Sequence, residues 1–111
     1  MAEQQWVYLD FEDKEYELGF TKQTVRLAES MGFDIGDLQN QSKVVTPITI
    51  LFYASFLAKH PGIKENLVDR IYDDLDNKGE LVSKLVEIYS DTISAMMANG
   101  KNATWSVLPK K

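Results

Sequence analysis

The sequence predicts an α+β fold that is mostly α-helical, with an N-terminal β-hairpin packed on a bundle of about four helices. Over residues 6–20 apolar and polar residues alternate, which is typical of strands with one buried face. From residue 22 onward apolar residues recur every three or four positions, between capping residues and Pro or Gly breaks. At 111 residues the chain can build one core. We therefore expect one globular domain over residues 1–100 and a tail over residues 101–111.

The predicted hairpin covers residues 6–20 and has one apolar face. Folding back at Asp13 and Lys14 would bring two apolar triplets onto this face. A lone hairpin is marginal in water, so the helices must cover it. Trp6 and Tyr8 fall on the opposite face, where they either contact a partner or are partly buried against the tail and Trp105. The two triplets are Val7, Leu9 and Phe11, and Tyr16, Leu18 and Phe20.

The first two helices are expected at about residues 22–31 and 47–59. Thr21 is a suitable N-cap for the first, and Gly32 suits the left-handed position after its end. Its residues Val25, Ala28 and Met31 are expected to face the hairpin. One helical turn is expected at residues 35–38, followed by a mobile polar connection at 39–43. For the second helix the start and stop signals are Thr46 as N-cap, Pro47 as first helical residue, and Pro61 with Gly62 after its end.

Two more helices are expected at about residues 64–76 and 80–98. Asn77, Lys78 and Gly79 separate them, and Asn99 with Gly100 closes the last one. The last helix has two adjacent apolar lines, one of which contains Tyr89, Ile93 and Met97. This is more apolar surface than one packing stripe requires.

Composition and charge exclude several classes of function. The 17 acidic residues outnumber the 12 basic ones, for a net charge of −5, which argues against nucleic acids and anionic membranes as partners. The absence of cysteine excludes disulfides and thiolate metal sites. The start of the chain does not resemble a signal peptide, and the longest apolar run, near residues 48–58, is too short for a bilayer span. We therefore expect a cytoplasmic protein.

No enzyme active site or cofactor is expected. The single histidine, His60, lies at a helix end before Pro61, where a cation is favoured by the helix dipole, and this is preferred to an acid–base role. Asp74, Asp76 and Gly79 match three positions of a calcium-loop template. Two ligand positions of that template fail, so a charged turn between helices is the better interpretation.

After catalytic and metal sites are set aside, the residues that could serve a function are apolar. The second helix is apolar around almost its whole circumference, so it is either the central helix of the core or a helix shared with a partner. Met96 and Met97 can adapt to varied apolar surfaces, although methionine also fills cores. The candidate partner-binding residues are Trp6, Tyr8, Phe52, Tyr53, Phe56, Tyr89, Ile93, Met96 and Met97.

Four segments carry a resemblance to a known family: residues 14–21 (KEYELGFT), 31–35 (MGFDI), 75–81 (LDNKGEL) and 87–89 (EIY). By these four segments and the order in which they follow one another, this chain resembles the small tail assembly chaperones of long-tailed bacteriophages and prophages of Gram-positive bacteria. The likeness covers roughly residues 6–98 and consists of residue types rather than invariant chemistry. Such proteins often have a glycine where this chain has Asp13, a departure that concerns only the turn type.

The resemblance implies a non-catalytic function in tail morphogenesis. Members of that family are thought to bind the tape measure protein and to recruit tail tube subunits in the host cytoplasm. They are absent from the mature virion. The resemblance also implies self-association into a homo-oligomer and, in many members, a longer form made by ribosomal frameshifting. The alternative is a small structural virion protein, such as a head–tail connector or tail terminator. An enzyme or metal protein is the least favoured class.

Overall fold

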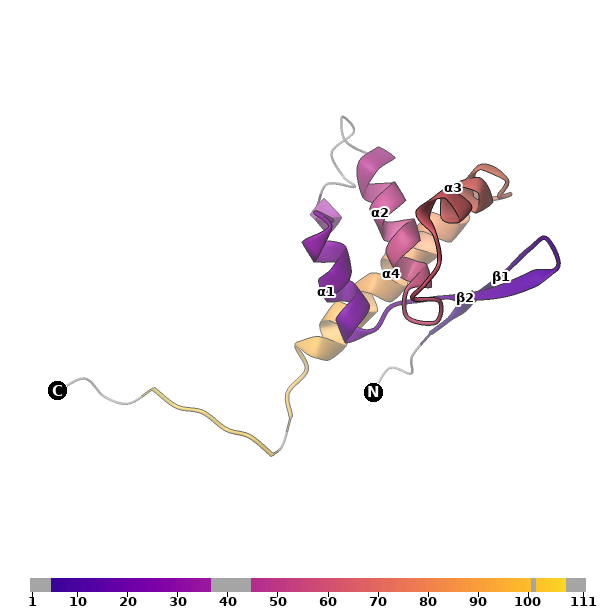
Figure 1. The fold of residues 1–111 in the computed structure, drawn as a ribbon. Helices are drawn as coiled ribbons and strands as arrows, with labels where there is room; N and C mark the ends of the chain where they lie inside the picture. The colour runs from indigo at the N-terminus through magenta and orange to yellow at the C-terminus, as the bar shows by residue number, and fades with distance from the viewer. Residues whose placement is uncertain (1–4, 37–44, 101, 108–111) are drawn as a thin grey trace.

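The computed structural model of the chain describes residues 5–36, 45–100 and 102–107. A two-stranded antiparallel hairpin comes first and four helices follow, which confirms the predicted fold class (Figure 1). The elements are β1 (Val7–Phe11), β2 (Lys14–Leu18), α1 (Lys22–Ser30), α2 (Val45–Phe56), α3 (Glu65–Asp73) and α4 (Lys78–Met96).

The register of the hairpin brings the predicted apolar residues together. Val7 pairs with Leu18 and Leu9 with Tyr16, so these side chains share one face of the sheet. The turn is one residue earlier than predicted, because Phe11 pairs with Lys14 and leaves only Glu12 and Asp13 in the loop. Both loop residues have positive φ, 51° and 62°. This is the type I′ conformation, which matches the right-handed twist of the strands.

Helix α1 begins and ends at the predicted capping residues. Thr21 accepts from the backbone N–H of Thr24, while the Thr24 hydroxyl accepts from the backbone N–H of Thr21. At the other end Gly32 has φ 96°, and two hydrogen bonds, from Gly32 to Glu29 and from Phe33 to Ala28, complete a Schellman motif.

The expected contact between α1 and the hairpin is corrected by the structure. Helix α1 packs mainly against α2 and α4. Its residues Val25 and Ala28 are buried, whereas Met31 is exposed. The hairpin is held from another direction, because β2 packs against α2. Helix α2 covers both the hairpin and α1, which is why α1 does not need to cover the sheet itself.

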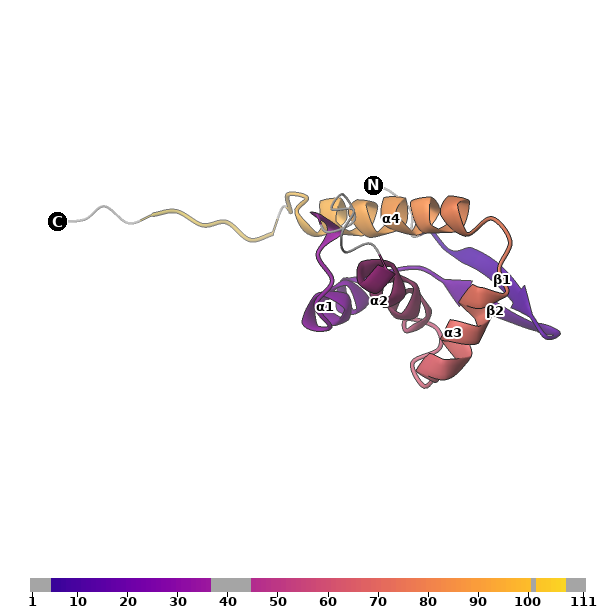
Figure 2. The same cartoon turned by 90° about the horizontal axis from the view of Figure 1, so that it is seen from above.

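Helix α2 is the central element of the fold. It contacts α1, α3, α4 and β2 (Figures 1 and 2), and Leu51, Ala54 and Phe56 on it are completely buried. Of the two interpretations of its all-round apolar character, central core is therefore the one that holds.

The limits of α2 differ from the prediction at both ends. The helix begins at Val45, so Thr46 and Pro47 are its second and third residues rather than its N-cap and first residue. It ends at Phe56, three residues early, because Leu57 donates to Ala54 in a tighter turn. Proline at position 61 also disfavours helical geometry at His60.

The break between α3 and α4 lies at residues 74–77, slightly earlier than expected. Asn77 has a left-handed conformation, with φ 54°, so Lys78 and Gly79 already belong to the first turn of α4. Ile35 and Gly36 form part of a short 3₁₀ turn. The predicted continuation of this turn to residue 38 and the connection at residues 39–43 lie outside the described residues. Beyond α4, residues 102–107 run away from the body as an extended chain (Figure 1).

Candidate protein-binding surfaces

Three of the residues proposed for partner binding lie in the core. Phe52, Phe56 and Tyr89 are 2%, 0% and 2% exposed. Phe52 and Phe56 meet edge to face at 5.1 Å, and Tyr89 meets the rings of Phe20 and Phe33 in the same manner. Their place among the partner-binding residues is wrong in this fold, because their contact surface is used to join elements of the chain itself. Tyr53 and Ile93 are half-buried and pack on the same core.

Trp6 and Tyr8 differ in their surroundings. Trp6 is half-buried, with its ring close to Gly19 and the ammonium group of Lys59 at 4.7 Å from the ring centroid. Tyr8 is 63% exposed. The alternative that the tail buries these residues is wrong, since Trp105 is itself 86% exposed.

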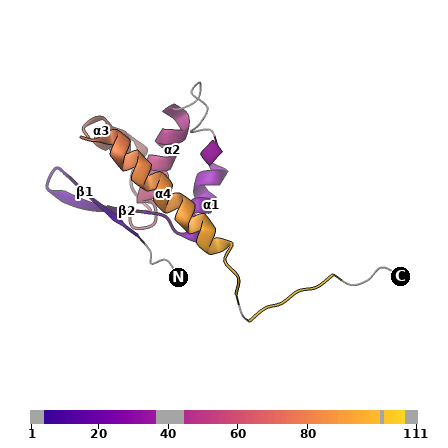
Figure 3. The same ribbon diagram turned by 180° about the vertical axis from the view of Figure 1, so that it is seen from behind.

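Exposed apolar side chains occur on α1 and at the end of α4, two helices that pack against each other, and the tail leaves the body after α4 (Figures 1 and 3). We refer to these four side chains, Leu27, Met31, Met96 and Met97, as the methionine end. Leu27 and Met31 are four residues apart and so share one face at the end of α1. The sequence pattern does not identify Leu27 as a surface residue, and it places Met31 against the hairpin, whereas both are exposed.

A second surface lies along the outer edge of β1, next to the junction of α3 and α4 (Figure 2). It is an open groove of about 430 Å³ that we call the hairpin groove. Its apolar lining comes from Val7, Leu9, Leu75 and Leu81, and its charged groups are all carboxylates. It is lined by Val7, Tyr8, Leu9, Asp10, Leu75, Asp76, Asn77, Glu80 and Leu81.

The two outer edges of the hairpin are not equivalent. In a hairpin closed by a two-residue loop, the N–H and C=O groups of alternate residues point outward, here those of Glu15 and Glu17 on β2 and those of Tyr8 and Asp10 on β1. The β2 edge is partly covered: Glu17 donates to Nε2 of His60 at 3.1 Å, and just beyond the strand Gly19 donates to the carbonyl of Ser55 at 2.9 Å.

The β1 edge is open to an added strand. Among the hydrogen bonds of the described residues, none reaches the outward backbone groups of Tyr8 or Asp10. Unpaired backbone groups at a strand edge form a template on which a further strand can pair. The hairpin groove follows this edge, since four consecutive residues of the strand line it.

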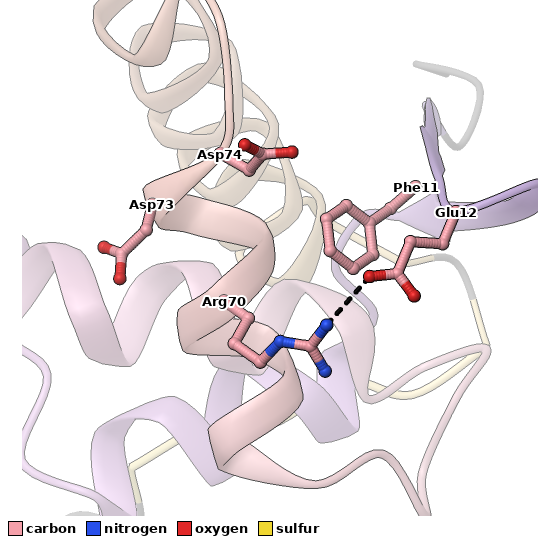
Figure 4. Close-up of a pocket in the computed structure, with 5 residues that line it drawn as sticks. All are labelled: Phe11, Glu12, Arg70, Asp73 and Asp74. Atoms are coloured by element: carbon pink, nitrogen blue, oxygen red, sulfur yellow. Dashed lines mark hydrogen bonds and ion pairs between the residues drawn. The ribbon is translucent and has the colours of Figure 1, made fainter.

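A pocket of about 400 Å³ lies between the tip of the hairpin and α3 (Figure 4). Arg70 donates to Glu12 at 2.8 Å, and its guanidinium group lies 5.8 Å from the centroid of the Phe11 ring. The carboxylates of Asp73 and Asp74 point away from this pair (Figure 4). Both members of the ion pair are well exposed, so the pair makes only a small contribution to stability.

Three further observations concern titratable side chains. In the described part of the chain, no three His, Cys, Asp or Glu side chains are placed so that they could hold a metal ion. Nε2 of His60 accepts a hydrogen bond from the backbone N–H of Glu17, so the hydrogen bond of this ring is with β2 and not with the end of α2. Burial raises the pKa of Tyr89, and the nearby charges of Glu29 and Asp34 raise it further.

The sequence comparison identifies a family. Residues 1–108 match the family described as a domain of unknown function, DUF5055. The chain belongs to this family. No curated protein and no solved structure matches it.

The DUF5055 chain thus has two surfaces of different character. The methionine end consists of exposed, flexible apolar side chains on helices, whereas the hairpin groove combines an apolar lining with carboxylates and an open strand edge. Within the described residues no helix is both long and apolar enough to cross a membrane.

Proposed function

We propose that this DUF5055 protein is a phage tail assembly chaperone. It binds the tape measure protein in the host cytoplasm without catalysis, recruits tail tube subunits, and leaves before the virion is complete. The identity of the client follows from the family resemblance of residues 14–21, 31–35, 75–81 and 87–89, and the binding mode follows from the surface.

The proposal rests on the methionine end. Six large apolar side chains are exposed on α1, at the end of α4 and in the tail. Among the other described residues, Tyr8 is the only large hydrophobic side chain that is exposed. Met97 is 79% exposed, so most of its surface is available to a partner. Apolar residues on adjoining helices form the kind of surface on which an amphipathic helix of a client can lie.

The chemistry of this surface suits a client with many similar helices. Methionine is unbranched and adapts to varied apolar shapes, so one surface can accept different segments of a long protein. The net charge of −5 keeps a protein with such an apolar surface soluble.

Co-expression with a tape measure protein from the same phage tests the proposal. We expect the wild-type chain to keep the tape measure protein in the soluble fraction. A Leu27→Asp, Met97→Asp double variant should lose most of this effect. Ser83→Asp is the matched control, because Ser83 is an exposed residue of the same helix, α4, outside the methionine end.

Two results would contradict the proposal. The first is a tape measure protein that precipitates equally with and without the wild-type chain. The second is the recovery of peptides from this chain, by mass spectrometry, in stoichiometric amounts from purified particles.

A further inference from the structure

The tail beyond α4 and the open edge of β1 have complementary properties. Residues 102–107 are extended, and Trp105 and Val107 are 86% and 81% exposed. These two side chains are two residues apart, so in a strand they point to the same side, with Thr104 and Ser106 on the other. The segment therefore has the apolar–polar alternation of a strand with one buried face.

We propose that the tail segment around Trp105 of one copy adds as a third strand to the outer edge of β1 in a second copy. Its backbone would pair with the outward groups of Tyr8 and Asp10. Trp105 and Val107 would then lie in the hairpin groove against Leu75 and Leu81, which are only partly buried by the chain itself.

The charges of the two segments also match. The charged residues of the hairpin groove are Asp10, Asp76 and Glu80, all acidic. The sequence that follows Val107 carries two lysines, Lys110 and Lys111, and no acidic residue. Pairing of the tail with the groove thus brings opposite charges together, which favours this occupant over an acidic or neutral strand.

The distances along the chain favour the groove of a second copy over the groove of the same chain. The groove lies at the first turn of α4 and the tail leaves from its last turn (Figures 1 and 2). At 1.5 Å per residue, Leu81 is about 24 Å back along the helix from Met97. At about 3.3 Å per residue, the segment from Met97 to Trp105 spans about 26 Å when fully extended. To reach the groove of its own chain, the tail would therefore have to turn back sharply at the end of α4 and then be fully extended.

A mixing experiment with two full-length variants tests this contact. Tyr8→Pro blocks the β1 edge but keeps the tail. It leaves the pairing with β2 intact, because the N–H of Tyr8 points outward and edge strands tolerate proline there. Trp105→Ser removes the exposed anchor and keeps the groove. Sedimentation velocity at increasing protein concentration reports the association state.

We expect the wild-type chain to form species larger than one chain of 12.7 kDa as its concentration rises. Each variant alone should stay at the mass of one chain. An equimolar mixture should form a species of twice that mass, because Tyr8→Pro supplies a tail and Trp105→Ser supplies a groove. Higher salt should weaken the association.

The controls keep the result interpretable. If circular dichroism shows that Tyr8→Pro is unfolded, the double variant Asp76→Lys, Glu80→Lys replaces it, since both residues are exposed. The proposal is overturned if the wild type stays at the mass of one chain. It is also overturned if the two variants associate alone as strongly as the wild type. A buried Trp105 in a solitary chain, seen as blue-shifted fluorescence in a Trp6→Phe background, would assign the groove to the chain's own tail.

Discussion

The backbone N–H of Glu17 donates a hydrogen bond to Nε2 of His60 at 3.1 Å, across 43 positions of the sequence. The imidazole ring also lies 5.2 Å from the Tyr16 ring and 6.5 Å from the Phe56 ring. His60 thus joins the outer edge of β2 to the segment that follows α2. This contact occupies part of the outer edge of β2, whereas among the described residues no hydrogen bond reaches the outward groups of Tyr8 and Asp10 on β1.

Replacing His60 by alanine should destabilise the protein by about 1–3 kcal/mol, because the N–H of Glu17 would lose its partner and the aromatic contacts would be lost. His60→Gln, which keeps an acceptor, should recover part of this loss. Urea unfolding followed by circular dichroism measures the change, with an unchanged m-value showing that the fold is retained. Equal midpoints for the wild type and His60→Ala would contradict the role of this hydrogen bond.

Gly19 is required by the close approach of Trp6. A Cβ atom at this position would lie 2.6 Å from Cε3 of Trp6 and 2.9 Å from the carbonyl oxygen of Gln5. Gly19→Ala should therefore reduce the free energy of unfolding by about 1–3 kcal/mol through overpacking. The loss should be smaller in a Trp6→Ala background, where the ring is absent. Gly62→Ala is the matched control: a Cβ there meets nothing within 4 Å, so we expect little change.

The central position of α2 predicts that replacing Phe56 by alanine costs far more stability than replacing Met97 by alanine. Phe56→Ala removes a fully buried ring in contact with Tyr16 and Phe52 and should cost about 3–5 kcal/mol of stability. Met97→Ala removes an exposed side chain and should change stability by less than about 0.5 kcal/mol. Thermal unfolding of both variants gives the comparison. If Phe56→Ala unfolds at the same temperature as the wild type, α2 is not the centre of the core.

Tyr89 should make the protein sensitive to alkali. Its pKa is raised in the folded state, so the folded chain holds the phenolic proton more tightly than the unfolded chain. Stability from this group is complete below the ordinary tyrosine pKa of about 10 and is lost as the pH rises through the higher folded value. Tyr89→Phe should flatten this part of the curve of unfolding free energy against pH. A wild type and variant with parallel curves above pH 10 would contradict the assignment.

The hairpin turn can be improved. Glu12 and Asp13 both have positive φ, a conformation in which side chains cause strain and glycine does not. Asp13→Gly should stabilise the protein by up to about 1 kcal/mol, as at other type I′ turns. Glu15→Gly, in the strand beside the turn, should instead destabilise it. Chemical unfolding curves measure both changes, and a loss of stability in Asp13→Gly would rule out this turn geometry.

Local signals in the sequence predicted the order of elements and several of their ends. Thr21 and Gly32 act within one turn of the chain, so their capping roles could be inferred without the fold. The end of α2 could not be inferred in this way. Leu57 and Ala58 continue the apolar pattern, while the backbone already turns after Phe56.

The candidate surfaces depended on contacts between distant segments. The apolar character of α2 indicated burial, but not whether the chain itself or a partner provides it. Phe52, Phe56 and Tyr89 therefore could not be distinguished by pattern from residues such as Met97. The hairpin groove arises only when residues 75–81 lie beside β1, and the sequence contains no local signal of that arrangement.

The central place of α2 has a consequence for the chain as it leaves the ribosome. Residues 7–30 are synthesised before α2, yet Leu18, Phe20 and Val25 have no cover until α2 and α4 are present. The nascent chain must therefore keep these first apolar segments exposed until α2 has left the ribosome. Their cover is completed only when α4, the last helix of the described residues, has followed.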